Sequence, residues 1–327
     1  MKIVLSGMRP TGPLHIGHFF GALLNWRQLP DQGYRCFYMI ADWHALSTEY
    51  ASPQQIRNNV EEVALDFLAA GLDPQKSTIF VQSDVPEHTE LHLLLSMITP
   101  VAWLERNPVY KEQLEALQDK ELNTYGFLGY PVLQAADILI YKANCVPIGI
   151  DQLPHLELTR EISRRFNYLY GPLFPEPEAL LTETPKIPGT DNRKMSKSYN
   201  NCIYLKDGPE TIREKITNMF TDPRRIYRRD PGHPESCPVF AYHQLFNLAE
   251  AQSIAASCIS AAIGCTDCKR NLAEKVVSFL QVIREKRQAL DADRELVRKI
   301  LAAGGQTARA VASETLGQAK KACSFKP

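Results

Sequence analysis

Two short polar motifs, far apart in the chain, carry residue types that suit phosphate chemistry. The first is His-Ile-Gly-His at residues 15–18, in a loop rich in glycine and proline, and the second is Lys-Met-Ser-Lys-Ser at residues 194–198. Glycine lets the backbone approach a phosphate, and imidazole, ammonium and hydroxyl groups can donate hydrogen bonds to its oxygens. Alone, the first could be a pair of helix-capping histidines and the second a solvated linker. Together they predict a nucleotide-phosphate site.

The elements around the first motif predict a parallel, doubly wound α/β sheet. Apolar runs with strand character lie at residues 3–6, 35–42, 77–83 and 145–150, and apolar residues with helical spacing lie at 18–29, 56–71 and 155–171. Strands that alternate with helices over such distances form parallel sheets. A glycine-rich loop after the first strand is a phosphate-binding position, although this loop matches neither the dinucleotide nor the Walker pattern.

The pattern predicts two domains. A Rossmann-type catalytic domain spans residues 1–198, with a helical insertion near residues 85–130 and the second motif at its end. Beyond about residue 200 the periodicity is helical without convincing strands, so residues 199–327 are predicted to form an all-α domain. A final helix could pack back on the first domain.

The composition limits the possible functions. Lys+Arg and Asp+Glu number 37 each, so only a local basic surface could bind nucleic acid. The N-terminus lacks an apolar segment of signal-peptide length, and the longest apolar stretch is too short and too interrupted to span a membrane. We therefore expect a cytoplasmic protein without membrane contact. Its eight cysteines would then bind metal, catalyse or be buried rather than form disulfides.

Four of the cysteines have a spacing that suits a metal centre. They follow the pattern C-x20-C-x6-C-x2-C and are Cys237, Cys258, Cys265 and Cys268. Four thiolates in a reducing compartment suit a [4Fe-4S] cluster or a tetrahedral Zn²⁺ ion. The metal-free alternative is a continuous helix that buries the last three cysteines on one face.

Similarity to the class I aminoacyl-tRNA synthetases, and among them to the tryptophanyl enzymes, extends over essentially the whole chain. The matching segments are GMRPTGPLHIGHFFGAL (7–23), ADWHAL (41–46), YPVLQAADILIY (130–141), VPIGIDQLPHLELTREISRRFN (146–167) and KMSKS. The resemblance implies a tryptophan–tRNA ligase. Such an enzyme uses ATP and Mg²⁺ to activate L-tryptophan as tryptophanyl-adenylate, releases pyrophosphate, and transfers the tryptophanyl group to tRNA(Trp).

The resemblance also implies how the two motifs act. They are expected to be cationic elements that hold the phosphates from two sides, with catalysis mostly by positioning and charge stabilisation. The catalytic residues would be His15, Gly17, His18, Lys194 and Lys197. The ATP-binding residues would be Arg9, Pro10, Thr11, Gly17, His18, Gly149, Ile150, Asp151, Ile187, Lys194, Met195, Ser196, Lys197 and Ser198. Many relatives carry Gln where Arg9 stands and an acidic residue where Ile150 stands, so this pocket is expected to be more positive.

The amino-acid pocket implied by the resemblance centres on a carboxylate in the apolar stretch LQAADILIY. A buried carboxylate is costly unless it is paired, and the indole N–H, which can only donate, suits Asp137. The expected tryptophan-binding residues are Asp137, Gln152, Tyr130, Gln134, His44, Val146 and Ile148. A capping or ion-paired Asp137 is the structural alternative. A tyrosine–tRNA ligase is the rival function, although the GMRPTG opening and VPIGIDQ favour tryptophan.

The predicted helical domain is where such a synthetase contacts the anticodon end of tRNA. Its arginine-rich stretch DPRRIYRRD could contact tRNA phosphates, or be an exposed face with its own acidic ends. The arginines are Arg224, Arg225, Arg228 and Arg229. A subset of tryptophanyl enzymes carries a [4Fe-4S] cluster with closely similar cysteine spacing, which favours a cluster over zinc here.

The family forms dimers through the catalytic domain, so the resemblance implies a homodimer. The apolar stretch LHLLLSMITPVAWLERNPVY (91–110) could belong to that interface or be intradomain core. Two functions of other classes are alternatives: a nucleotidyltransferase of the same superfold, and a silent tRNA-binding paralogue. The first would not need the tryptophan pocket, and the second would be expected to have lost one of the two motifs.

Overall fold

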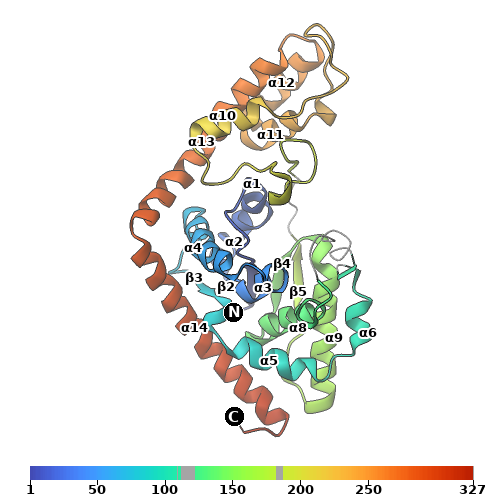
Figure 1. The fold of residues 1–327 in the computed structure, drawn as a ribbon, viewed down its shortest axis with the longest axis vertical. Helices are drawn as coiled ribbons and strands as arrows, with labels where there is room; N and C mark the ends of the chain where they lie inside the picture. The colour runs from blue at the N-terminus through green and yellow to red at the C-terminus, as the bar shows by residue number, and fades with distance from the viewer. Residues whose placement is uncertain (109, 112–121, 182–186, 327) are drawn as a thin grey trace. The chain divides into compact units, whose positions relative to one another are not determined.

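A computed structural model gives the fold of the protein and describes all residues except 109, 112–121, 182–186 and 327. The chain folds into two compact units (Figure 1). The sheet unit consists of Met1–Gly12, Ala22–Glu183 and Asp293–Pro327, and the helical unit of Pro13–Gly21 and Thr184–Ala292. This division differs from the predicted boundary between residues 198 and 199. The C-terminal helix joins the sheet unit, and the first motif joins the helical unit.

The sheet unit is built on five parallel strands in the order β3-β2-β1-β4-β5. The strands are β1 (Ile3–Met8), β2 (Arg35–Ile40), β3 (Ser77–Val81), β4 (Cys145–Ile148) and β5 (Glu178–Leu181). The four predicted strands are confirmed, and the sheet has the doubly wound order: β2 and β3 are added on one side of β1, and β4 and β5 on the other. The sequence pattern does not reveal β5, because it is a short edge strand that begins with Glu178 behind a proline-rich segment.

Residues of the strands and of several helices form an apolar core in the sheet unit. The helices of this unit are α2 (Leu24–Trp26), α3 (Asp42–Glu49), α4 (Pro53–Ala69), α5 (Glu87–Ser96), α6 (Val101–Glu105), α8 (Tyr125–Ile140), α9 (Leu153–Tyr170) and α14 (Arg294–Ala322). Phe37 of β2 stacks on Tyr141 with 4.6 Å between ring centroids. Helices α5, α6 and the start of α8 lie within the predicted insertion near 85–130, of which residues 109 and 112–121 lie outside the described part.

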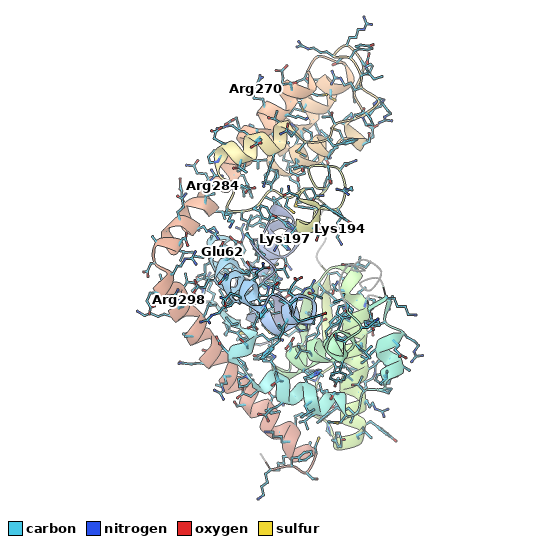
Figure 2. All side chains as sticks on the ribbon, viewed as in Figure 1. Glu62, Lys194, Lys197, Arg270, Arg284 and Arg298 are labelled. Atoms are coloured by element: carbon cyan, nitrogen blue, oxygen red, sulfur yellow. The ribbon has the colours of Figure 1, made fainter. Side chains whose placement is uncertain are left out.

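Helix α14 runs along β3, the edge strand of the sheet, and along α5 (Figure 1). A glycine permits the close approach, because a Cβ at Gly304 would lie 1.9 Å from the carbonyl oxygen of Ile79. Ion pairs fix both ends of the contact. Near the start of α14, Arg294 pairs with Glu61 at 2.9 Å and with Glu62 at 3.2 Å, and Arg309 Nε pairs with Glu87 Oε1 at 2.9 Å. Figure 2 labels Glu62 and, on α14, Arg298. The helix thereby covers a sheet edge that could otherwise pair with another chain.

The helical unit has no strand among its described residues, in agreement with the predicted all-helical pattern. Its frame consists of α10 (Pro209–Thr217), α11 (Pro238–Phe246), α12 (Leu248–Ile259) and α13 (Cys265–Ala292). The segment with the first motif is tied to this frame by backbone bonds, in which Ile16 N–H donates to Ile203 at 3.0 Å and Leu205 N–H donates to Leu14 at 2.9 Å. The part of the chain that the structure describes contains no helix long and apolar enough to cross a bilayer.

The predicted helix at 18–29 is interrupted. A short α1 (Ile16–His18) is followed by a π turn (Phe19–Leu23) and then by α2. Two neighbouring aromatic residues explain the interruption, because Phe19 and Phe20 both pack on Phe279, each with 5.6 Å between ring centroids. A π turn widens the helix locally and lets two successive side chains face one partner.

Candidate active site

A buried carboxylate marks one candidate site in the sheet unit. Asp137 is 1% exposed and lies on the same face of α8 as Tyr130 and Gln134, because spacings of three and four residues return to one side of a helix. Its carboxylate accepts hydrogen bonds from His44 Nε2 at 2.7 Å, Gln82 Nε2 at 2.8 Å and His88 Nδ1 at 2.6 Å. The ion-paired form of the structural alternative is therefore present, since Asp137 pairs with His44 and His88, and Gln82 adds a neutral donor.

Electrostatics keep this carboxylate ionised. Burial by itself raises the pKa of Asp137, but the hydrogen bonds and charges of His44 and His88 outweigh burial and lower the pKa to about 2. A buried anion held in this way can accept a further hydrogen bond but cannot donate one. The site therefore selects a ligand group that donates.

The donors reach Asp137 from the carboxyl ends of neighbouring strands. His44 lies on α3, which follows β2, and Gln82 is the first residue after β3, in the short turn Gln82–Asp84. His88 lies in the first turn of α5. The sequence analysis identified Asp137 and His44 but missed Gln82 and His88. A polar residue directly after a buried strand is a signal that could have found Gln82.

A second buried chain of hydrogen bonds holds Tyr130. Its hydroxyl lies 3.0 Å from His155 Nε2, and His155 Nδ1 lies 3.2 Å from Asn107 Nδ2. Burial raises the pKa of Tyr130 above its usual value and lowers the pKa of His155 to about 4. Both side chains are therefore neutral near pH 7, and Tyr130 has a fixed position.

A cavity of about 370 Å³ lies on the outer side of α3, α5 and α8. Its lining includes Trp43, Tyr50, His92, Tyr125, Tyr130 and Leu133. Tyr130 is the predicted site residue that borders it; Gln134, Asp137 and Gln152 do not. His92 Nδ1 is among the buried polar atoms that lack a hydrogen-bond partner in the described part of the chain.

The remaining predicted residues of the sheet unit gather where the strand order reverses. Residues 9–11 directly follow β1, and residues 149–152 follow its neighbour β4. A side chain at Gly149 would collide with Asp151, because its Cβ would lie 2.6 Å from Asp151 Oδ1. Ile150 is 74% exposed. Val146 is buried and Ile148 is half-buried on β4 itself.

The first motif lies in the helical unit, and its histidines are neutral. The His15 and His18 rings are 3.7 Å apart, and His15 N–H donates to His18 Nδ1 at 3.2 Å. Burial lowers the pKa of His15 to about 4, and burial followed by the charges of His15 and Lys197 lowers the pKa of His18 well below its usual value. Without bound phosphate, these lowered pKa values do not support the expectation that the histidines of the first motif are cationic. Burial turns these imidazoles into neutral hydrogen-bonding groups.

The two motifs lie against each other within the helical unit. A Cβ at Gly17 would lie 2.9 Å from the His15 ring and 3.4 Å from Met195 Sδ. Figure 2 shows Lys197 beside α1, with Lys194 on the same loop. Lys194 is exposed and Met195 is buried. A glycine is thus needed at position 17 both for the histidine pair and for the contact with the second motif.

One buried asparagine organises the second motif. Asn201 is 2% exposed, and its Oδ1 accepts from the backbone N–H of Ser196 at 2.8 Å. Its Nδ2 donates to Asp191 Oδ1 at 2.7 Å and to the carbonyl of Lys194 at 3.1 Å. The sequence analysis missed this role. Ile187, the predicted adenine neighbour, is 9% exposed and lies beside the strand-like bridge that joins Pro188 to Lys194.

The four cysteines gather at one end of the helical unit. The metal-free alternative of a continuous helix is wrong, because α12 ends at Ile259, Ala261 has a left-handed φ of 59°, and α13 begins at Cys265. Burial first, and then the neighbouring thiols of Cys237, Cys258 and Cys265, raise the pKa of Cys268 to about 12.

A glycine lets the backbone pack closely against one of these cysteines, because a Cβ at Gly232 would lie 2.4 Å from Cys258 Sγ. The guanidinium of Arg225 lies 3.8 Å from Cys258 Sγ and 4.0 Å from Cys265 Sγ. Even so, the described residues include no group of three or more His, Cys, Asp or Glu side chains arranged to hold a metal ion.

The arginine-rich stretch divides into two pairs. Arg224 pairs with Asp222 at 3.2 Å, and Arg225 donates to the carbonyls of Arg228 and Ile263 at 2.8 and 2.9 Å. The other pair is more exposed: the Arg228 side chain is 78% exposed, and Arg229 lies over the ring of Tyr227 at 5.5 Å. Arg224 is also exposed, with 53% of its side chain accessible, and Arg228 lies 3.9 Å from Asp267, so Arg225 is the least exposed of the four.

Comparison with known proteins places this geometry in a family. Residues 1–281 match the family described as tRNA synthetases class I (W and Y). A tryptophan–tRNA ligase of Thermotoga maritima is 52% identical over 98% of this chain and 98% of its own length, and one of Aquifex aeolicus is 44% identical over 98% and 99%. The solved structure of tryptophanyl-tRNA synthetase from Campylobacter jejuni, complexed with ADP and tryptophan, has a TM-score of 0.90 and 33% identity, and covers 99% of this chain and 100% of that chain.

Proposed function

The chain belongs to the class I tRNA synthetases of the tryptophan and tyrosine family, and within it we infer that this chain is a tryptophan–tRNA ligase. It activates L-tryptophan with ATP and transfers the tryptophanyl group to tRNA(Trp). The full-length relatives of 44% and 52% identity are tryptophan enzymes, which argues against the tyrosine alternative. The observation in the structure that carries the proposal is the buried, ionised Asp137, which can only accept.

We propose that the indole N–H of tryptophan donates to Asp137. Tyr130 and Gln134 share its face of α8 and would border the substrate. His44, Val146, Ile148 and Gln152 complete the predicted set. A site built to pair with a substrate N–H rejects analogues that lack it by about 10⁴- to 10⁵-fold.

In the activation step, a carboxylate oxygen of tryptophan attacks the α-phosphorus of ATP. The bond from that phosphorus to the bridging oxygen breaks, and its electron pair leaves with pyrophosphate. We propose that Lys194 and Lys197 stabilise charge on the leaving phosphates, while the neutral His15 and His18 donate hydrogen bonds. Gly17 would let the phosphates approach the backbone. Mg²⁺ bound to ATP would neutralise part of the phosphate charge.

The other predicted ATP ligands lie in different segments of the chain. Arg9, Pro10, Thr11, Gly149, Ile150 and Asp151 are in the sheet unit, and Ile187, Met195, Ser196 and Ser198 are in the helical unit. We propose that Arg9 adds positive charge to the ribose and phosphate region. Ile150, which is apolar and exposed, would contribute through its backbone rather than its side chain.

We propose that tRNA contacts the helical unit through the exposed arginines. Arg228 and Arg229 directly follow Tyr227, which is 62% exposed and could stack on a base. Replacing Arg229 by Gln should weaken tRNA binding and lower its salt dependence, with tryptophanyl-adenylate formation unchanged. Arg225 is the matched comparison, because its engagement with backbone carbonyls predicts a loss of stability rather than of tRNA affinity alone.

We propose a homodimer that buries the outer face of α5 and α6. Leu93, Met97 and Val101 are 55%, 73% and 55% exposed in the single chain. Together with the aromatic cavity beside them they form an apolar surface of the kind that marks an interface. Sedimentation should give a dimer for the wild type and a monomer for Met97→Glu. A monomeric wild type, or a Met97→Glu variant that stays dimeric, would contradict this surface.

We propose that Cys237, Cys258, Cys265 and Cys268 bind a [4Fe-4S] cluster, with Zn²⁺ as the alternative. The clustering of the thiols, the room left by Gly232 and the cationic Arg225 support the proposal. When bound, the centre would hold the segments around α11, α12 and α13 together. Metal analysis of protein purified without oxygen decides between iron, zinc and neither.

Charging of tRNA takes place where translation does, so we propose that the enzyme acts in the cytoplasm. The direct test of the proposed function is amino-acid-dependent exchange of pyrophosphate into ATP, run in parallel with tryptophan and tyrosine. Exchange with tryptophan alone is expected. Exchange with tyrosine alone, or with neither amino acid, would overturn the proposal.

A further inference from the structure

The donors around Asp137 do more than neutralise a buried charge. We propose that Gln82 and His88 are positioning residues of the amino-acid site: they occupy one oxygen of Asp137 completely, so that the other oxygen offers a single acceptor position to the substrate. This inference rests on the proposed function, because it takes the tryptophan indole as the group that Asp137 meets.

The hydrogen bonds on the two oxygens are unequal. Oδ1 of Asp137 accepts from Gln82 Nε2 at 2.8 Å and from His88 Nδ1 at 2.6 Å. Oδ2 accepts from His44 Nε2 at 2.7 Å. A carboxylate oxygen has two lone pairs, so Oδ1 is saturated and Oδ2 keeps one position. Gln82 and His88 are completely buried, which leaves no water to take their place.

Each of the two donors is itself oriented. Gln82 Oε1 accepts from the backbone N–H of His44 at 3.4 Å, which turns Nε2 of the same amide toward Asp137. His88 Nε2 lies 2.8 Å from the hydroxyl of Tyr141. Burial holds the pKa of Tyr141 well above its usual value, so its hydroxyl stays protonated and fixes the imidazole ring through Nε2. The other ring nitrogen, Nδ1, faces the Asp137 carboxylate, which can only accept, and therefore carries a proton.

The orientation of the donors fixes the orientation of the carboxylate. A partial rotation of the Asp137 carboxylate about its Cβ–Cγ bond would break the bonds to Gln82 and His88 together, and a half turn only exchanges two equivalent oxygens. The free acceptor position on Oδ2 consequently has one direction. A ligand with one N–H and no acceptor atom at that place satisfies it fully, and the indole ring is such a ligand. A sulfur atom in place of the N–H would leave the position without a donor, at a cost in free energy.

The start of α5 is held from outside the site. Glu87, next to His88, accepts from Arg309 Nε at 2.9 Å and from Ser313 Oγ at 2.7 Å, both on α14. One turn along α5, Glu90 forms a more exposed ion pair with Lys320 of the same helix. Glu90→Gln is therefore a matched control, because it weakens the contact between α5 and α14 without touching the donors of Asp137.

The test compares two substrates in pyrophosphate exchange: tryptophan and 3-benzothienylalanine, in which sulfur replaces the indole N–H. The ratio of their kcat/KM values is measured for wild type, Gln82→Met, Tyr141→Phe and Glu90→Gln. We expect Gln82→Met to lower the ratio by about 10-fold or more, with the value for the sulfur analogue little changed. Tyr141→Phe should lower the ratio less, because this variant removes only the hydroxyl that fixes the His88 ring through Nε2. Glu90→Gln should leave it unchanged.

The pH dependence separates positioning from packing. Loss of a donor raises the pKa of Asp137, so the ratio in Gln82→Met should fall further as the pH decreases toward 5, while that of wild type stays level. If the ratio survives in both Gln82→Met and Tyr141→Phe, or if both substrates fall together, Gln82 and His88 have only a structural role and the inference is overturned. A wild type without tryptophan-dependent exchange would instead overturn the proposed function, and this inference with it.

Discussion

The surroundings of Asp137 in the sheet unit and the two motifs in the helical unit differ in how far their polar groups are satisfied. Asp137 has three protein donors and one position left. In the helical unit, His15 Nδ1 is a buried atom without a hydrogen-bond partner among the described residues, and Lys194 is exposed. A nearly complete network selects one rigid donor. Polar groups with unused hydrogen-bonding capacity suit phosphates, whose charge changes during the reaction.

The largest effect is expected from Asp137→Asn. The amide of asparagine has one acceptor oxygen, where the carboxylate has two. It therefore cannot accept from His44, His88 and an indole N–H together, and the buried donors lose their anion. Removal of one partner of a buried, hydrogen-bonded charge costs about 2–5 kcal/mol. Tryptophan-dependent kcat/KM should fall accordingly, with the KM for ATP unchanged. A variant that keeps its preference for tryptophan over tyrosine would show that Asp137 does not recognise the substrate.

Lys197→Ala should also have a large effect, but on the rate of the reaction rather than on the affinity for tryptophan. Loss of one preorganised group that stabilises transition-state charge reduces kcat by about 10²- to 10³-fold. Since Lys197 belongs to the helical unit, the equilibrium affinity for tryptophan should not change. Single-turnover formation of the adenylate measures the rate, and equilibrium dialysis measures the affinity. Lys206→Ala, which alters a lysine outside the motif, is the control.

A smaller effect is expected from Asn201→Ala. The variant removes the acceptor for Ser196 N–H and the donor to Asp191 and the Lys194 carbonyl, so the second motif loses its internal support. Because the lysines of the motif are still present, tryptophan-dependent pyrophosphate exchange should slow by only about 10-fold, in line with the loss of buried hydrogen bonds. Hydrogen exchange of residues 194–201 should become faster. If neither the rate of pyrophosphate exchange nor the rate of hydrogen exchange changes, Asn201 does not organise the loop.

The smallest effect concerns pH. With its pKa at about 4, His15 is neutral at pH 6 in all but about 1% of molecules. The KM for ATP should therefore show no step from this histidine between pH 6 and 8. A step near pH 6.5 that disappears in His15→Gln would mean that the motif binds phosphate as a cation after all.

Much of this arrangement can be predicted from the sequence, because local patterns determine it. The runs at residues 3–6, 35–42, 77–83 and 145–150 become strands, since each is a short apolar run between polar turns. Asp137 stands out because it is a charged residue in an apolar helix. Its partner His44 was predicted through the resemblance rather than from the local pattern.

Other features depend on contacts between distant residues, which no local pattern contains. Gln82 and His88 reach Asp137 from segments about 50 residues away. The neutrality of His15 depends on burial in a unit whose other segment begins at residue 184. The break between α12 and α13, which separates the cysteines, depends on the left-handed Ala261, and alanine gives no signal of such a turn.

The most direct measurement is a crossed comparison of Asp137→Asn and Lys197→Ala by calorimetric titration with tryptophan and, separately, with a non-hydrolysable ATP analogue. Asp137→Asn is expected to lose affinity for tryptophan only, and Lys197→Ala affinity for the nucleotide only. If both variants lose affinity for both ligands to the same extent, Asp137 and Lys197 do not recognise the amino acid and the phosphates separately, and the roles assigned to these two residues are wrong.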